Sequence, residues 1–314
     1  MKNHRNRPFD ILCAGELLVD FISSGFAETL DEAKSFERHL GGSPANLCMN
    51  MARLGNATSL AASVGQDDMG SLLKAFVENS GVDCTFLRQV PAPTTLILVT
   101  RTTSVANFEA YRMADAMIAA SQLPLKRLQQ SRIFHTTCFG LGKKPGQTTI
   151  MRAARLAAEN GCQLSIDANY AAKTWPDRED PKKFVEEFCN LGAIVKVSEV
   201  DWERLYQTPL TDASTAAKHF LRLGASLVCV TMGSEGAYVA TADGGEYLPA
   251  RKVEVKDTTG AGDAFWSGFL TAWLDGHSPI DCAKAGRSMA EMKISRFGPL
   301  PLKVDKALIY SDLQ

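Results

Sequence analysis

Residues Asp257–Leu270 read DTTGAGDAFWSGFL, in which small residues and carboxylates stand directly before an apolar run. Phe265, Phe269 and Trp273 recur every four residues, so the segment that begins at the second glycine of GAG is expected to be a helix with one apolar stripe. Gly276 follows as a helix stop. The GAG glycines therefore lie at a helix N-terminus, where amides without intrahelical acceptors favour an anion.

Asp263 falls in the first turn of this helix, and its residue type fits two interpretations. A carboxylate there compensates the helix dipole, which is worth about 0.3–1 kcal/mol. A carboxylate beside an anion site would also repel that anion, unless it has a second task such as taking a proton from a hydroxyl nucleophile. The stretch by itself leaves helix capping and catalysis equally open.

The rest of the chain alternates short apolar runs with longer periodic ones, and this alternation predicts an α/β fold around a central, mostly parallel sheet. The expected strands are Ile11–Ala14, Ser59–Val64, Leu96–Thr100, Arg132–Thr136, Gln163–Asp167, Ala193–Val197 and Ser226–Thr231. The expected helices are Pro44–Leu54, Met69–Asn79, Thr148–Glu159, Pro181–Cys189, Ala213–Leu223, Gly262–Leu274 and Ile280–Lys293.

Two segments, Asp20–Leu40 and Asp83–Tyr111, interrupt the alternation because neither contains a long helical pattern. Both alternate or carry β-branched residues, as in TTLILVTRTTSV. Ordinary edge strands and loops would explain this, but a small separate sheet is the favoured interpretation.

Composition excludes several classes of function. The 314 residues suffice for one large domain with a small appendage, and 45% hydrophobic with 22% charged residues is typical of an ordinary soluble globular protein. A net charge of −1 gives no basic footprint for nucleic acid. Asp10, Glu16 and Asp20 interrupt the first apolar run, so we expect neither a signal peptide nor a membrane span. The eight cysteines form no CxxC pair, which indicates reduced thiols in a cytoplasmic protein.

Two further stretches carry polar residues at places where ligands bind. In GGSPANLCMNMARLG (Gly41–Gly55), Ser43 suits a helix N-cap and Pro44 the first helical position. In GELLVD, Asp20 follows the first strand, and ligands collect at the carboxyl ends of strands in open α/β sheets. A plain capped helix and a solvated carboxylate remain the alternatives for these residues.

Taken in order, GELLVD, GGSPANLCMNMARLG and DTTGAGDAFWSGFL resemble the signatures of the PfkB, or ribokinase-like, family of carbohydrate kinases. VGQDDMG (Val64–Gly70) and VTMGSEGAYV (Val230–Val239) add to the resemblance, which covers nearly the whole chain. It implies a single three-layer α/β/α domain over residues 1–314. The segments near 20–40 and 83–111 would be a β-sheet lid that closes over the sugar and joins two copies in a homodimer.

The resemblance also implies a role for each matching position. Asp263 would be the base that deprotonates the sugar hydroxyl, and Gly260, Ala261 and Gly262 would form an anion hole. The sugar would be bound by Asp20, Gly41, Gly42, Asn46, Arg112 and Asp167. The nucleotide site would be lined by Lys196, Ser198, Thr231, Gly233, Gly236 and Thr258. ATP would bring Mg²⁺ on its phosphates, with Asp201 as a candidate ligand, and K⁺ would bind near Asp257.

Three stretches depart from the family pattern. SEVD (Ser198–Asp201) stands where relatives carry NxxE, and DANYA (Asp167–Ala171) stands where many sugar kinases carry DPNxR. Arg287, Glu291 and Lys293 bring charge into a helix expected to be mostly buried, which leaves a divergent phosphate donor open.

The choice of sugar is read from NFEAYRMADAM (Asn107–Met117), which resembles the YRxxxAD stretch of fructokinases and 2-keto-3-deoxygluconate kinases. Arg112 can bind a carboxylate or a hydroxyl. Relatives that use sugar acids tend to add a second arginine at the position of Ala171. Fructose is therefore the first expectation, and 2-keto-3-deoxygluconate or 5-dehydro-2-deoxygluconate the alternatives. A non-catalytic sugar-sensing protein is the alternative of another class.

Overall fold

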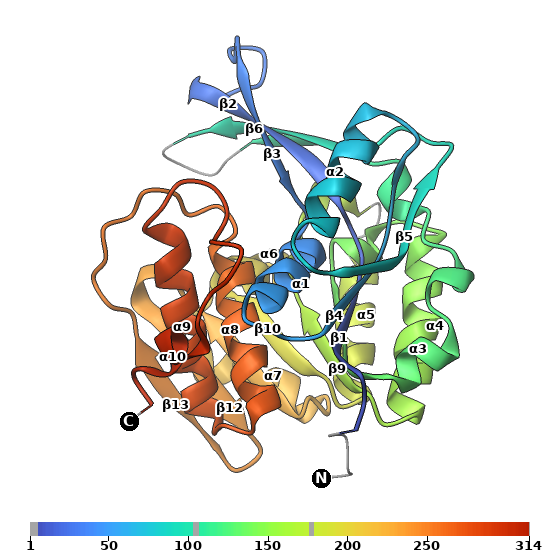
Figure 1. Cartoon of the computed structure of the whole chain (residues 1–314). Helices are drawn as coiled ribbons and strands as arrows, with labels where there is room; N and C mark the ends of the chain where they lie inside the picture. Colours follow the sequence, from blue (N-terminus) through green and yellow to red (C-terminus); the bar gives the residue numbers. More distant parts are fainter. Residues whose placement is uncertain (1–5, 103–106, 176–178, 314) are drawn as a thin grey trace.

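A nine-stranded sheet forms the centre of the computed structural model, which describes residues 6–102, 107–175 and 179–313 (Figure 1). The strand order is β13-β12-β11-β10-β9-β8-β1-β4-β5. The strands are β1 (Phe9–Ala14), β4 (Thr58–Gly65), β5 (Asp83–Val90), β8 (Ser131–Thr137), β9 (Gln163–Asp167), β10 (Ile194–Ser198), β11 (Leu227–Thr231), β12 (Gly236–Thr241) and β13 (Gly244–Pro249). All neighbours from β11 to β5 are parallel, and only β12 and β13 among these strands are antiparallel. The predicted mostly parallel sheet is confirmed.

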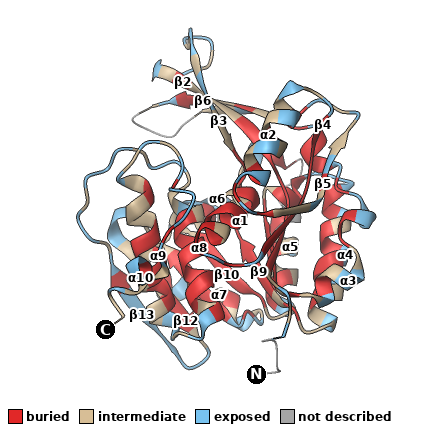
Figure 2. Ribbon diagram, in the orientation of Figure 1, coloured by how far each residue is buried: buried red, intermediate tan, exposed pale blue. Residues whose placement is uncertain are grey.

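Helices cover both faces of this sheet and produce three layers, with the buried residues concentrated between them (Figure 2). One face carries α1 (Ser43–Arg53), α2 (Asp68–Glu78), α8 (Ala261–Asp275), α9 (Pro279–Ile294) and α10 (Lys306–Tyr310). The other carries α3 (Leu125–Gln129), α4 (Gly146–Glu159), α5 (Glu179–Asn190), α6 (Glu199–Tyr206) and α7 (Ala213–Arg222). Successive residues of β1 divide between the two cores, as the period of a strand requires: Ile11 and Cys13 face α8, and Leu12 and Ala14 face away.

Every strand and helix expected from the sequence is present, with ends that differ by at most two residues. The sequence patterns did not reveal α3, α6, α10, β12 or β13. Five short 3₁₀ turns complete the described elements: η1 (Ala114–Ala116), η2 (Ala120–Gln122), η3 (Gly140–Gly142), η4 (Ala172–Thr174) and η5 (Gly233–Glu235).

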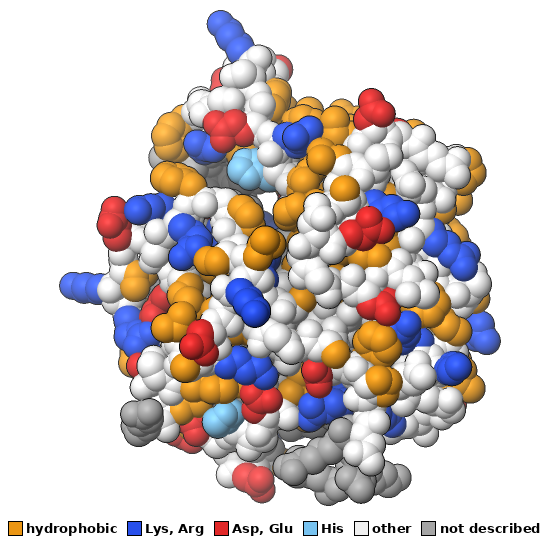
Figure 3. Space-filling view, viewed as in Figure 1, with side chains coloured by type: hydrophobic (Ala, Val, Ile, Leu, Met, Phe, Trp, Pro, Cys, Tyr) orange, Lys and Arg blue, Asp and Glu red, His pale blue; other side chains and the backbone are white. Residues whose placement is uncertain are grey.

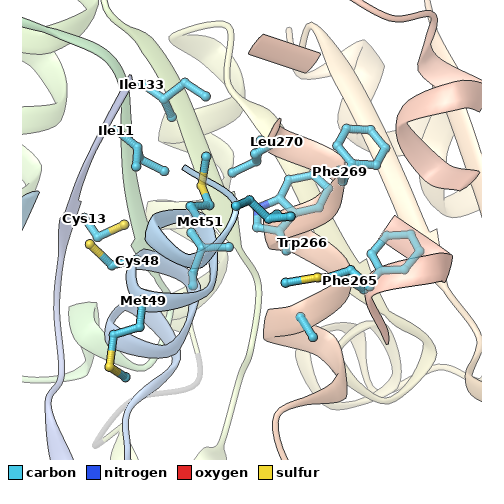
Figure 4. Packing of buried hydrophobic residues seen from close by; sticks show 14 of the residues in the cluster. Ile11, Cys13, Cys48, Met49, Met51, Ile133, Phe265, Trp266, Phe269 and Leu270 are labelled. Carbon is cyan, nitrogen blue, oxygen red and sulfur yellow. The ribbon is translucent and has the colours of Figure 1, made fainter. Parts of the chain in front are cut away.

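Helix α8 has a wider buried surface than its predicted single stripe. Trp266 and Leu270 are as completely buried as Phe269, and Figure 4 shows these side chains packed near Met51 of α1. The second side is buried because α9 packs closely: a methyl group added to Gly268 would lie 2.6 Å from the carbonyl oxygen of Ala285. The amphipathic pattern was therefore wrong, although the helix ends at Gly276 as predicted.

A second sheet of four described strands lies apart from the main body in the order β3-β2-β6-β7 (Figure 1). Its strands are β2 (Leu18–Phe26), β3 (Phe36–Gly41), β6 (Leu96–Arg101) and β7 (Phe108–Tyr111). The predicted lid segment 83–111 began too early, because β5 pairs in parallel with β4 at the edge of the central sheet. Positions 103–106 of that segment lie outside the described residues.

The outer surface mixes both signs of charge. On the face shown in Figure 3, basic and acidic side chains are interspersed. Within the described ranges, none of the helices is both long enough and apolar enough to cross a membrane. All eight cysteines are free thiols, and all except the half-buried Cys84 are buried, as the sequence predicted.

Candidate active site

A cleft of about 1250 Å³ opens where β9, β10 and β11 end and α8 begins. The carboxyl ends of parallel strands are where α/β sheets place their ligands. Of the residues predicted to act in catalysis or to bind sugar, nucleotide or metal, the cleft is lined by Asp167, Lys196, Ser198, Asp201, Thr231, Gly233, Gly236, Thr258, Gly260, Ala261, Gly262 and Asp263. The structure thus brings together residues from four separate segments of the chain.

The GAG turn forms the N-terminus of α8 in a left-handed conformation, with φ of 73° at Gly260. Glycine adopts this conformation without steric cost. Ala261 donates its amide to the Thr258 carbonyl oxygen, whereas helix geometry gives the amides of Gly262 and Asp263 no acceptor within the helix. These two amides, together with the positive end of the helix dipole, suit a negatively charged group in the cleft.

Asp263 is held by two side chains of α1. Ser43 donates its hydroxyl to Oδ1 at 2.6 Å, and Asn46 donates its amide to Oδ2 at 2.9 Å. The predicted N-cap role of Ser43 was wrong, because the cap position is Gly42 and the Ser43 hydroxyl bonds Asp263 instead. Burial raises the pKa of Asp263, while the bonds from Ser43 and Asn46 and the nearby charge of Lys196 oppose that rise.

Asp20 reaches the same place from β2 in the small sheet. Burial, followed by the charge of Asp263, raises the pKa of Asp20 to about 7. A methyl group added to Gly41 would lie 3.4 Å from the Asn46 amide nitrogen and 3.7 Å from Asp20 Oδ2. Gly41 therefore leaves open the space on which Asp20 and Asn46 converge. The neighbouring Gly42 serves packing, since a methyl group there would lie 2.3 Å from the Glu16 carbonyl oxygen.

The raised pKa of Asp20 predicts a dependence of stability on pH. The folded state holds the proton more tightly than the unfolded chain, so this contribution to stability is complete below pH 3.8 and is lost as the pH rises to about 7. Asp20→Asn stays neutral and should therefore melt above the wild type at pH 8. Because Asp20 keeps some contact with solvent, we expect a gain of about 2–4 °C, or roughly 1 kcal/mol. Calorimetry of both proteins at pH 5 and pH 8 would check this. If the difference in melting temperature between Asp20→Asn and the wild type were the same at both pH values, the prediction would be contradicted.

Lys196 and Asp167 form a buried ion pair on the floor of the cleft, with 2.8 Å between Nζ and Oδ2. Burial alone would lower the pKa of Lys196, but Asp167, Asp201 and Asp263 together raise it, so the ammonium stays charged. A methyl group on Gly262 would lie 3.4 Å from this ammonium. Asp167, predicted to bind sugar, is thus engaged by Lys196 beside the GAG turn.

Arg112 is committed to the protein itself. Its Nε and Nη2 donate to Asp115 Oδ2 at 2.9 and 2.6 Å, and Nη1 donates to the Phe139 carbonyl oxygen at 2.9 Å. Both charged side chains are buried. These bonds use three of the five N–H groups of the guanidinium and fix the chain below the small sheet, and the contact of Arg112 with the sugar stays a prediction.

Asp201 lies in the first turn of α6, a helix that the sequence patterns did not reveal. Its Oδ2 accepts bonds from the amide and the hydroxyl of Ser198, which is a capping box at the start of α6, and Oδ1 accepts from the Tyr170 amide. These bonds occupy both oxygens of Asp201, the carboxylate expected to bind Mg²⁺. The described residues contain no group of three or more His, Cys, Asp or Glu side chains arranged for a metal.

The charged residues of α9 are explained by ion pairs at the far end of the cleft. Arg251 binds Glu291 and Asp312, while Arg287 binds Asp312 and the Pro249 carbonyl oxygen. The two ion pairs with Asp312 hold the C-terminal segment against the rim of the cleft. Lys293 forms an ion pair with Asp257, with 3.1 Å between Nζ and Oδ2. Asp257 is the carboxylate expected to bind K⁺.

Sequence reasoning missed Glu16, which links three elements behind the site. Its carboxylate accepts bonds from the Ser43 amide at 3.1 Å and the Thr137 hydroxyl at 2.9 Å. Burial raises the pKa of Glu16 to about 8. A glutamate directly after a buried parallel strand was the available signal.

The chain is similar in sequence and in structure to known proteins. A family model described as pfkB family carbohydrate kinase matches residues 9–305. The ATP-dependent 6-phosphofructokinase of Thermoanaerobacterium thermosaccharolyticum is 30% identical over 297 residues, covering 94% of this chain and 91% of that protein. Fructokinase-1 of Zea mays is 33% identical over 264 residues, or 83% and 81% of the two chains. The solved fructokinase of Halothermothrix orenii superposes with a TM-score of 0.80 at 29% identity, over 93% of this chain and 100% of the other.

Proposed function

Because the chain belongs to the pfkB family of carbohydrate kinases, we propose that it transfers the terminal phosphoryl group of ATP to a primary hydroxyl of a ketohexose, with fructose as the first candidate. One observation carries this proposal. The half-buried Asp263 carboxylate stands at the N-terminus of α8, held by Ser43 and Asn46 and close to Asp20. Fructokinases among the similar proteins support the choice of sugar.

The residues divide the chemistry between them. Asp20 and Asn46 offer an acceptor and a donor that would orient the sugar, and Asp263 would take the proton from its attacking hydroxyl. The first-turn amides of α8 and the ammonium of Lys196 would stabilise the negative charge of the phosphoryl group in transit. Phosphoryl transfer depends mainly on such positioning and charge stabilisation.

The open end of the cleft is proposed to take the nucleotide. A methyl group on Gly233 would meet only the Glu199 carboxylate within 4 Å, at 3.8 Å, so the backbone there leaves room for a ligand. A similar protein of Thermoanaerobacterium thermosaccharolyticum is ATP-dependent. Since Asp201 is engaged in its capping box, Mg²⁺ would enter on the nucleotide phosphates.

The engaged cations near the sugar favour a neutral substrate. A buried carboxylate on the substrate needs a cation, but Arg112 is tied to Asp115. Lys173, two residues beyond Ala171, is tied to Glu109 at 2.7 Å. This favours fructose over 2-keto-3-deoxygluconate and 5-dehydro-2-deoxygluconate. Fructose 6-phosphate is the second candidate, because the 6-phosphofructokinase relative matches over almost the whole chain.

A substrate panel tests this choice. ADP release would be measured with fructose, fructose 6-phosphate and the two sugar acids at equal concentrations. We expect fructose to give the highest kcat/KM and the acids to be about tenfold to a hundredfold lower, the value of one missing charge-assisted hydrogen bond. A strong preference for a sugar acid would contradict the charge argument. If none of the four compounds led to ADP release, the sugar-sensing alternative would be favoured.

The small sheet is proposed to act as the lid, with Asp20 on its inner side. Closure over the sugar would keep water from the phosphoryl group. Hydrogen exchange with saturating fructose should then slow in β2, β3, β6 and β7. Strand β5 provides an internal control, since it belongs to the central sheet and should change little. Equal protection of the four lid strands with and without sugar would rule out closure.

We also propose that two copies associate through this sheet in a reducing cytoplasm. Phe26 and Tyr111 on the small sheet are strongly exposed, which supports a covering partner. The eight free cysteines support the reducing compartment. Light scattering should give twice the mass of one chain.

A further inference from the structure

Lys293 lies in the last turn of α9 with its side chain almost completely buried. Its Nζ is 3.1 Å from Asp257 Oδ2, and the other oxygen of that carboxylate accepts the Thr259 amide at 2.9 Å. A methyl group on Gly260 would lie 3.9 Å from Lys293 Cε. The lysine side chain therefore runs directly alongside the turn that leads into α8.

The same loop is also fastened through its backbone. The Ile294 carbonyl oxygen, at the end of α9, accepts the amides of Lys256 at 2.7 Å and Asp257 at 3.2 Å. Segment 256–260 is thus joined to α9 by two backbone bonds and one ion pair. Its position fixes where the first amides of α8 point.

The charge of Lys293 matters as much as its position. Without a cation, the Asp257 carboxylate would place a partly buried negative charge beside a site that must accept an anionic phosphoryl group. The Lys293 ammonium contacts Oδ2 and the Thr259 amide bonds Oδ1, so both oxygens of the carboxylate already have partners. The K⁺ site expected at Asp257 therefore does not fit this chain.

We propose that the ammonium of Lys293 serves as a built-in monovalent cation, which neutralises Asp257 and holds segment 256–260, so that phosphoryl transfer proceeds without a free alkali cation. Lys293 is then a positioning residue, because it acts through the loop and the α8 amides. The inference rests on the phosphoryl-transfer site proposed above. An ammonium group and K⁺ are similar in size and bind carboxylate oxygens alike, which makes the substitution chemically reasonable and testable by rescue.

The first experiment uses the wild type alone. Turnover with the best substrate of the panel would be measured in KCl, NH₄Cl and choline chloride at constant ionic strength. ADP would be quantified by chromatography, so that no coupling enzyme contributes a cation requirement of its own. We expect rates to agree within about twofold. An activation by K⁺ of about tenfold or more would overturn the proposal without any variant.

The second experiment removes the ammonium. Lys293→Ala in choline chloride should lose about tenfold to a hundredfold in kcat with little change in the KM for sugar, as expected for one charge-assisted bond. NH₄⁺ or K⁺ should restore most of it, whereas the smaller Li⁺ should not. Lys293→Arg, which keeps a positive charge, should retain most activity in choline. Lys284→Ala is the matched control, because Lys284 lies on the same helix and pairs with Asp281 at the surface.

A thermal measurement separates this inference from the proposed function. NH₄⁺ should raise the melting temperature of Lys293→Ala relative to choline, but should leave the wild type and Lys284→Ala unchanged, whichever sugar is the substrate. If Lys293→Ala turned over as fast as the wild type in choline chloride, the proposal would be overturned. A folded, impaired variant whose rate and melting temperature respond to neither NH₄⁺ nor K⁺ would also overturn it.

Discussion

Asp263→Asn is expected to lower turnover about 10²–10⁴-fold, the usual loss when a general base is removed. The substitution keeps the shape of the side chain and leaves an oxygen for Ser43 or Asn46. Affinities for sugar and nucleotide should therefore change little. Steady-state kinetics and equilibrium binding of both ligands would check this. Turnover within threefold of the wild type would show that Asp263 only caps α8.

The pH profile supplies an independent control for the same residue. Asp263 must be ionised to accept a proton, and burial raises its pKa, so kcat/KM should fall on the acid side at a higher pH than an ordinary aspartate would give. Ser43→Ala removes a donor that favours the ionised form, so that it should move the acid limb to still higher pH. If the acid limb of the kcat/KM profile did not move in Ser43→Ala, a group other than Asp263 would control it.

Lys196→Met should give the largest loss of stability in the cleft. Removing the ammonium leaves Asp167 buried without its partner, and breaking a buried pair in this way costs about 3–5 kcal/mol of the free energy of unfolding. Turnover should also fall steeply, because the positive charge beside Gly262 is lost. Urea unfolding and kinetics at a temperature where the variant is folded would measure both effects.

The double variant Lys196→Met with Asp167→Asn separates structure from catalysis. It removes the uncompensated carboxylate, so most of the stability should return. Turnover should stay low, because the ammonium beside Gly262 is still missing. Recovery of turnover together with stability would show that Lys196 acts only as a structural partner of Asp167.

The local patterns of the chain were enough for the architecture and for the centre of the site. Buried strands and periodic helices reveal themselves through near-neighbour composition, and the GAG turn depends on residues that are adjacent in sequence. Asp20, Asn46 and Asp263 were proposed as site residues through the resemblance to the family motifs, because local patterns left their roles open.

The partners of the charged groups could not be found this way. Ser43 and Asp263 are 220 positions apart, and Lys293 and Asp257 are 36 apart. Their pairing arises only when α1, α8 and α9 pack around the same end of the sheet. Arg112 likewise binds Asp115 and the Phe139 carbonyl oxygen, which no local pattern indicated. A buried charge must take whichever opposite charge or polar group the packed chain brings within reach, since leaving it unpaired in a low dielectric costs more than any local preference can supply. That selection depends on distances between segments, which periodicity and motif spacing do not contain.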